Sequence, residues 1–266
     1  MSNLQAHAPI GVFDSGVGGL SVLVAIRRAL PQESLIYVAD SAHIPYGERS
    51  PEYIDARVKA MAEFLLAQGV KAIVIACNTA TVVAVQNLRS WCPVPVVAIE
   101  PAIKPAAQQT RSGVVGVIGT SRTLASPNVA RLCATYGTNV DIRLQACPGL
   151  VEMVEDGALM ADATRALLTS YLRPMLEAGA DTLVLGCTHY PFLRELIGEI
   201  VGPGVQLIDP ADAVARELVR RLGDDRVQGS ETDAGGESFY ATGLPERAEA
   251  MISMLWGKPV TVMAAD

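Results

Sequence analysis

Two cysteines occupy equivalent places in a stretch that this sequence writes twice. Residues 69–79 read GVKAIVIACNT and residues 179–189 read GADTLVLGCTH, and they align without a gap so that Cys77 falls on Cys187. Each copy is a short apolar run that follows a glycine and ends in a cysteine, which is typical of a fully buried parallel strand. Because ligands bind beyond the carboxyl ends of the strands in open α/β sheets, we expect both thiols to lie where a substrate binds.

Two thiols that face one carbon atom from opposite sides can invert its configuration. One thiolate removes a proton, the other thiol supplies a proton from the far side, and the reverse reaction exchanges their roles. A free cysteine has a pKa of about 8.5, and a helix N-terminus lowers it. Each repeated cysteine immediately precedes a predicted helix start, so we expect the helix dipole to help both. A single cysteine is more often a small buried hydrophobe, and we assign that role to Cys92, Cys133 and Cys147.

Composition and charge exclude several classes of function. The net charge of −7 and the pI of about 5.1 argue against nucleic acid as the main partner. The first ten residues contain no basic segment followed by an apolar run, and the most apolar span, 70–85, is too short to cross a bilayer. We therefore expect a cytoplasmic protein that does not bind a membrane. Five cysteines without a CxxC motif predict neither a disulfide framework nor a structural zinc site.

The N-terminal stretch is predicted to be a strand over 9–15, a glycine-rich turn and a helix over 21–30. The glycines either form a nest for an anionic group or simply allow a tight turn, and both interpretations stay open. The dinucleotide fingerprint fails because its third glycine is missing, and no P-loop is present. Asp14 and Ser15 end the strand and therefore point toward a site, although Asp14 could instead cap the next helix.

The rest of the first half continues the alternation of strands and helices. A strand over 34–41 leads into a structured loop over 42–50 that contains Pro45-Tyr46-Gly47. Tyr46 either faces a ligand or packs, and His43 has no partner that the sequence identifies. The remaining predicted elements are a helix over about 52–67, the first cysteine strand, a helix over 79–90, a strand over 95–100 and a helix over 101–109.

From about residue 112 the same order of elements repeats. The predicted elements are strands over 114–120 and 140–146, a loop over 147–157, a helix over 162–178, the second cysteine strand over 182–187, a helix over 191–200 and a strand over 205–210. The tail is predicted as a helix over 210–222 capped by Asp209, an exposed turn over 224–237, a strand over 238–243, a helix over 245–256 and a strand over 259–263. Two tail strands alone would bury too little surface, so we place the tail on the first unit.

The predicted fold class is therefore α/β, with two pseudo-symmetric α/β domains that have mainly parallel sheets and an active site in the cleft between them. The first domain is discontinuous and comprises 1–100 plus 209–266, and the second comprises 101–208.

Four motifs carry a resemblance to a known family. FDSGVGGLSV (13–22), ADSAHIPYGERS (39–50), ACNTAT (76–81) and GCTHYPFL (186–193) resemble the glutamate racemases of the aspartate/glutamate racemase superfamily. The resemblance spans residues 10 to about 210 in the expected order. It implies a two-base racemase that needs no cofactor, neither PLP nor a metal, forms a homodimer and makes D-glutamate for peptidoglycan.

The resemblance also implies roles for individual residues. Cys77 and Cys187 would be the two catalytic acid/bases, with Asp14 beside the first thiol and His189 and Glu155 beside the second. The residues implied in binding the small-molecule substrate glutamate are Asp14, Ser15, Pro45, Tyr46, Gly47, Asn78, Thr79, Thr120, Thr123, Thr188 and His189. We expect N–H groups, hydroxyls and the Asn78 amide to hold both substrate carboxylates, with no arginine in the pocket.

Other functions stay open at this point. A sister racemase that acts on aspartate or hydantoins would keep the mechanism, whereas a one-cysteine decarboxylase is disfavoured by the two thiols. A cysteine hydrolase would use His189 to activate Cys187, but no third group that orients the histidine is evident in the sequence, and Cys77 would be idle. An amino-acid-binding module without catalysis is the last alternative.

Overall fold

The structure, a computed structural model, describes residues 7–223 and 235–265, and it consists of two compact units. The first comprises Met1–Ile99 with Ala211–Asp266, and the second comprises Glu100–Pro210. Most of the exposed turn predicted at 224–237 lies outside the described residues. That each of these units is a domain that folds independently stays a prediction.

In the described residues, the first unit holds a six-stranded sheet with the order β10-β9-β2-β1-β3-β4, in which neighbouring strands are parallel. Its strands are β1 (Ile10–Asp14), β2 (Leu35–Ala39), β3 (Ala72–Ile75), β4 (Val96–Ala98), β9 (Glu237–Ala241) and β10 (Val262–Ala264). The first three are buried along their whole length, as the unbroken apolar runs predict. The tail strand β9 pairs with β2, so the prediction that the tail rejoins the first unit is confirmed.

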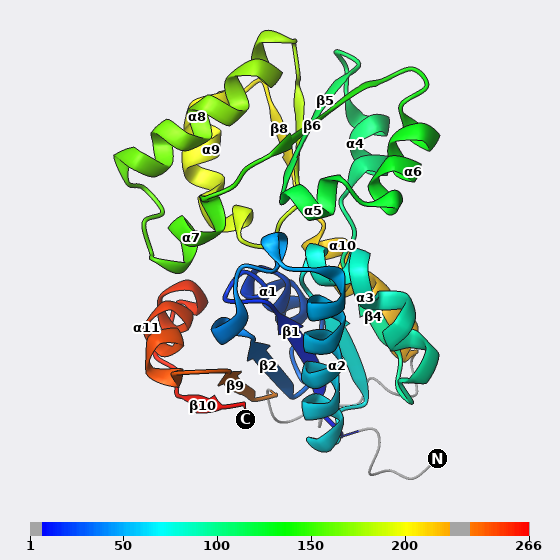
Figure 1. Ribbon diagram of the computed structural model, residues 1–266, viewed down its shortest axis with the longest axis vertical. Helices are drawn as coiled ribbons and strands as arrows, with labels where there is room; N and C mark the ends of the chain where they lie inside the picture. Colours follow the sequence, from blue (N-terminus) through cyan, green and yellow to red (C-terminus); the bar gives the residue numbers. More distant parts are fainter. Residues whose placement is uncertain (1–6, 224–234, 266) are drawn as a thin grey trace. The chain divides into compact units, whose positions relative to one another are not determined.

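Helices cover both faces of this sheet (Figure 1). They are α1 (Leu20–Ala29), α2 (Pro51–Ala67), α3 (Asn78–Trp91), α10 (Ala211–Leu222) and α11 (Pro245–Trp256). The side chain of Ser50 caps α2 by accepting from the Tyr53 N–H, and Pro51 provides its first turn. The apolar stripe of α2 then packs with α3 over Phe13, Ile73 and Ile75 of the sheet.

In the second unit, a four-stranded parallel sheet has the order β6-β5-β7-β8. Its strands are β5 (Val114–Gly119), β6 (Asp141–Ala146), β7 (Thr182–Leu185) and β8 (Gln206–Ile208). Its helices are α4 (Ile103–Gln109), α5 (Ser121–Leu124), α6 (Pro127–Tyr136), α7 (Leu150–Glu155), α8 (Asp162–Glu177) and α9 (Arg194–Val201), shown in Figure 1. The order matches β2-β1-β3-β4 of the first unit, so the internal repeat is a repeat of topology.

Two local predictions for the second unit are wrong. The predicted loop over 147–157 contains helix α7, whose buried Leu150, Val151 and Val154 follow helical spacing. The helix predicted from 191 begins only at Arg194, after the 3₁₀ turn η4 (Tyr190–Leu193). Pro191 disfavours a helical conformation for the residue before it, so the α-helix cannot extend back to the cysteine.

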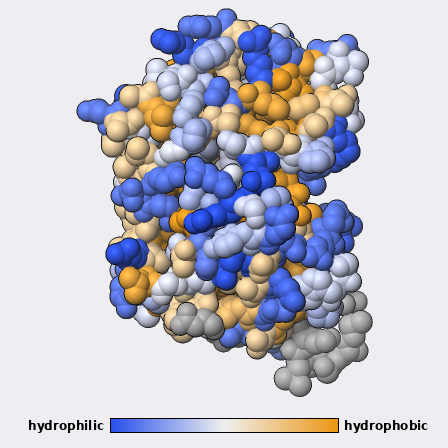
Figure 2. Space-filling model, in the orientation of Figure 1, coloured by the Kyte–Doolittle hydropathy of each residue, from blue (hydrophilic) through white to orange (hydrophobic). Residues whose placement is uncertain are grey.

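The surface mixes polar and apolar side chains on the face drawn in Figure 2. Among the described residues, no helix is long and apolar enough to span a membrane.

Candidate active site

The first repeated cysteine lies where β3 gives way to α3. Cys77 is the N-cap residue of that helix, is only 5% exposed, and its sulfur accepts from the Ala80 N–H at 3.4 Å. A helix N-terminus and a backbone donor both favour negative charge on the sulfur. The expectation that this cysteine immediately precedes a helix start is therefore confirmed.

A chain of hydrogen bonds connects Cys77 to the neighbouring strand end. The thiol donates to Ser15 Oγ at 3.6 Å, and the Ser15 hydroxyl donates to Asp14 Oδ1 at 3.0 Å. The Ser15 N–H also donates to Asp14 Oδ1, at 2.5 Å. Since β1 and β3 are adjacent in the sheet, the fold itself brings Asp14, Ser15 and Cys77 together.

Asp14 is fully buried and does not cap α1, whose N-cap residue is Gly19. A Cβ added at Gly19 would lie 2.7 Å from the Cβ of Asp14. The glycine is therefore required by its close approach to Asp14, which is the physical reason for a glycine at this turn.

Asn78 and Thr79 are buried in the first turn of α3, beside Cys77. Neither the oxygen nor the nitrogen of the Asn78 amide has a hydrogen-bond partner among the described residues. Buried polar groups in native proteins are nearly always paired, so an amide with both atoms unpaired points to a ligand.

The second repeated cysteine lies just beyond β7 and has different neighbours. Cys187 Sγ is 3.8 Å from His189 Nδ1, and His189 Nε2 is 2.7 Å from Glu155 Oε1 at the end of α7. Burial alone would lower the pKa of His189, but its hydrogen bonds to Cys187 and Glu155 raise that pKa well above the ordinary value. The direction of this pKa shift favours the imidazolium form of His189 beside the thiol.

The two thiols are thus stabilised differently, and one expectation is wrong. No α-helix starts at Cys187, because α9 begins at Arg194. Cys187 has the His189–Glu155 pair beside its sulfur, whereas Cys77 has the N-terminus of α3. A glycine is required at position 186, just beyond β7, because a Cβ there would lie 2.7 Å from the carbonyl oxygen of Ile118.

The other predicted residues of the second unit lie at the same sheet edge. Thr120 follows β5, caps α5, and its hydroxyl donates to Thr123 Oγ1 at 2.9 Å. Thr188, which lies between Cys187 and His189 in the chain, is buried. Cys147 follows β6, and burial raises the pKa of its thiol to about 12. That neutral, buried thiol fits the structural role expected for Cys147.

The loop between β2 and α2 contains two short 3₁₀ turns, η2 (Ser41–His43) and η3 (Tyr46–Glu48). Tyr46 is buried, and its hydroxyl donates to Asp40 Oδ2 at 2.5 Å. Burial and the Asp40 charge raise the pKa of Tyr46 far above its ordinary value, so it stays a phenol. Gly47 lies in η3 and Pro45 directly precedes it. His43 does have a partner, since its Nδ1 is 2.5 Å from the Tyr53 hydroxyl.

Three residues were missed by sequence reasoning. Asp40 follows β2 just as Asp14 ends β1, so its place in the sheet was a usable signal. Arg57 binds Asp40 from α2, and Arg122 lies between Thr120 and Thr123 with its Nε buried and unpaired among the described residues. The absence of arginine from the substrate pocket stays a prediction.

No group of three or more histidine, cysteine or acidic side chains in the described parts of the chain is arranged to hold a metal ion.

Sequence comparison places this chain in a family. The pattern of the Asp/Glu/Hydantoin racemase family matches residues 10–218, and the chain therefore belongs to that family. A glutamate racemase of Ectopseudomonas mendocina is 52% identical over 259 residues, covering 97% of this chain and 98% of that protein.

Solved structures agree with this membership. A glutamate racemase isoform from Bacillus anthracis matches with a TM-score of 0.88 at 34% identity, over 98% of both chains. A glutamate racemase from Francisella tularensis, solved in complex with D-glutamate, matches with a TM-score of 0.83 at 31% identity, over 97% of both chains. The α/β fold with parallel sheets is thus confirmed.

Proposed function

We propose that this enzyme interconverts L- and D-glutamate by proton transfer at the α-carbon, with Cys77 and Cys187 as the two acid/bases and no cofactor. The observation that carries this proposal is that each repeated cysteine lies just beyond a buried parallel strand and has its own hydrogen-bonding partners. Family membership and relatives named glutamate racemase support the substrate. The D-glutamate formed would supply peptidoglycan synthesis in the cytoplasm, and the active form would be a homodimer.

At Cys77, the proposed role of the surroundings is to hold and move one proton. The α3 N-terminus and the Ala80 N–H stabilise the thiolate form of Cys77, which is the form that accepts the α-proton. The Ser15 hydroxyl and the Asp14 carboxylate continue the hydrogen-bond chain away from the sulfur, so the proton has a relay. The Asp14 carboxylate also offers a charge for the substrate ammonium.

At Cys187, the proposed role falls to the Glu155–His189 pair. A histidine with a raised pKa is a cation at neutral pH and favours the thiolate beside it. When the Cys187 thiolate removes the α-proton of one enantiomer, the Cys77 thiol donates its own proton to the opposite face of the planar intermediate, and the other enantiomer reacts with these roles exchanged. One proton is removed and another is supplied, so the step balances without an oxidant or co-reactant.

The substrate carboxylates are proposed to bind to hydroxyls, amides and backbone N–H groups. The unpaired Asn78 amide is the best-supported donor. The other proposed contacts are Ser15, Pro45, Tyr46, Gly47, Thr79, Thr120, Thr123, Thr188 and His189. Because the Tyr46 hydroxyl is already bound by Asp40, its loop would contact substrate through the backbone of residues 45–47.

A cysteine hydrolase is the second candidate. The third group that was not evident in the sequence is Glu155, which binds His189 Nε2 at 2.7 Å. Cys187, His189 and Glu155 therefore have the order of a nucleophile, a base and an orienting acid. That function would leave the Cys77 site unused.

Serine substitutions separate the two candidates. Cys77→Ser and Cys187→Ser are each expected to lower racemisation of L-glutamate, followed by circular dichroism, by at least about a thousandfold, because each removes one of two required acid/bases. Cys133→Ser, at a half-buried thiol away from both strand ends, serves as the matched control and should keep full activity. Full hydrolytic activity in Cys77→Ser, together with an acyl-enzyme trapped on Cys187, would establish the hydrolase instead. Activity on L-aspartate or a hydantoin alone would keep the mechanism and change the substrate.

A further inference from the structure

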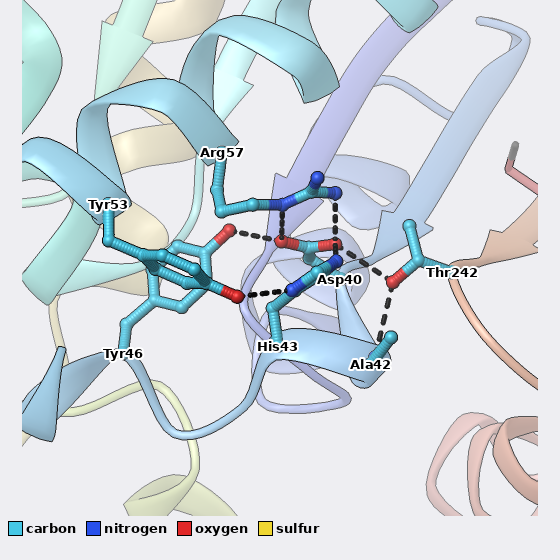
Figure 3. Close-up of polar contacts among 7 residues, drawn as sticks. All are labelled: Asp40, Ala42, His43, Tyr46, Tyr53, Arg57 and Thr242. Carbon is cyan, nitrogen blue, oxygen red and sulfur yellow. Dashed lines mark hydrogen bonds and ion pairs between the residues drawn. The ribbon is translucent and has the colours of Figure 1, made fainter.

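Asp40 is a buried side chain of the first unit with several hydrogen bonds that the mechanism above does not use. It is fully buried at the carboxyl end of β2, and its two oxygens accept from three side chains (Figure 3). Oδ2 accepts from the Tyr46 hydroxyl at 2.5 Å and from Arg57 Nε at 2.9 Å. Oδ1 accepts from Arg57 Nη2 at 2.8 Å and from Thr242 Oγ1 at 2.8 Å.

These four hydrogen bonds use the whole capacity of the carboxylate. An ionised carboxylate offers about four lone-pair sites, and a fully satisfied buried network is rigid. The fork of Arg57 meets both oxygens, which is the strong bidentate geometry, and neutralises the charge that burial would otherwise penalise. Asp40 is therefore a fixed anchor.

The anchor holds the segment Ser41–Glu48, here called the 41–48 loop, at two points. Tyr46 attaches the second half of the loop to Asp40 through its hydroxyl. Thr242 attaches the first half, because its Oγ1 also accepts from the Ala42 N–H at 3.2 Å. Figure 3 shows Thr242 bridging Ala42 and Asp40 from the side opposite to Tyr46.

The loop matters because it lies against the Cys77 site. The Tyr46 ring belongs to the same buried cluster as Cys77 and Ala80, and η3 packs on α3. A shift of the tyrosine would therefore move the loop backbone relative to the thiol.

We propose that Arg57 and Thr242 are positioning residues for substrate binding, which act through Asp40 to hold the 41–48 loop in place. This inference rests on the proposed function only for its kinetic readout. It also gives the C-terminal tail a role: β9 pairs with β2 and so delivers Thr242 to a loop 200 residues earlier in the chain.

The test uses Thr242→Val in the full-length protein, because valine keeps the shape and removes only the bridging hydroxyl. Loss of one hydrogen bond to a charged group corresponds to about a tenfold effect. We expect KM for glutamate to rise by about tenfold with kcat within about twofold, since loop contacts bind substrate but transfer no proton. Amide hydrogen exchange in peptides that cover the loop should also accelerate by about tenfold. Tyr46→Phe and Arg57→Lys should shift both readouts in the same direction.

Glu33→Gln provides the matched control. Glu33 forms a buried ion pair with Lys71 at 2.5 Å, at the opposite, amino end of the same sheet. Its substitution should lower stability without changing KM or exchange in the loop. The proposal is overturned if Thr242→Val leaves both readouts at wild-type values, or if Glu33→Gln changes them as much. If the wild-type protein does not racemise glutamate, the proposed function fails, and the exchange measurement alone decides on the loop.

Discussion

Replacing Glu155 by glutamine tests the account of the Cys187 site most sharply. The substitution keeps the shape of the side chain and removes the charge that faces His189 Nε2 at 2.7 Å. A hydrogen bond to a charged group contributes about 1.5–3 kcal/mol, and the 18% exposure of the Glu155 side chain favours the lower end of that range. Since each 1.4 kcal/mol is tenfold, we expect kcat/KM to fall by about 10- to 30-fold.

The pH dependence follows from the raised pKa of His189. Without the Glu155 charge that pKa falls, so the imidazolium is lost earlier and the alkaline limb of the pH–rate profile moves to lower pH. A group with a raised folded pKa contributes stability that is fully present below its unfolded pKa and disappears as pH rises through the folded value. The stability difference between wild type and Glu155→Gln should therefore be largest between about pH 5 and 6.5 and shrink at alkaline pH.

The assay is racemisation followed in both directions by circular dichroism across the pH range. Because L- and D-glutamate have equal free energy, kcat/KM must fall equally for both enantiomers. Glu152→Gln, an exposed position one turn earlier in α7, is the matched control and should behave as wild type. The reasoning is refuted if Glu155→Gln has the rate and the pH profile of that control.

Three further predictions concern stability and the strand ends. Partial burial raises the pKa of Asp181, but hydrogen bonds from hydroxyls and backbone N–H groups outweigh this effect and lower that pKa. Asp181→Asn should therefore lower Tm at pH 7, and the difference in Tm should vanish as pH falls through the depressed pKa of Asp181. Arg27 donates to four backbone carbonyls, so Arg27→Met should cost about 1–3 kcal/mol in urea unfolding; an unchanged midpoint would contradict this. Gly186→Ala should lower activity at least about tenfold by displacing the second thiol, whereas Gly198→Ala, with open space around it, should stabilise α9 by about 0.5–1 kcal/mol and keep activity.

The sequence predicts the fold well where one local signal dominates. Unbroken apolar runs predict buried parallel strands, and the repeated order of elements predicts two similar units. In the structure, the order β6-β5-β7-β8 of the second sheet matches β2-β1-β3-β4 of the first. Helix α7 was not predicted, because the repeat places residues 147–157 where the first half has its structured loop, although Leu150, Val151 and Val154 follow helical spacing.

The site is less predictable because tertiary pairing builds it. Cys77 and Cys187 are visible as a repeat with a helix predicted after each, but their surroundings differ. Only the structure shows that Cys77 alone lies at an α-helix N-terminus, whereas the His189–Glu155 pair lies beside Cys187. Asp40 is joined to Arg57 and Thr242 across 17 and 202 residues of chain. Neither separation is a helical or strand spacing, so no periodicity reveals the pairs.

The most direct test of the central claim is to incubate the purified enzyme with L-glutamate in D₂O without added cofactor. Optical rotation and α-deuterium would be followed together by polarimetry and NMR. Two thiols that exchange protons with solvent predict that rotation disappears while deuterium accumulates at the α-carbon, and that Cys77→Ala and Cys187→Ala each abolish the loss of rotation. Unchanged rotation with no deuterium at the α-carbon would contradict the two-thiol mechanism.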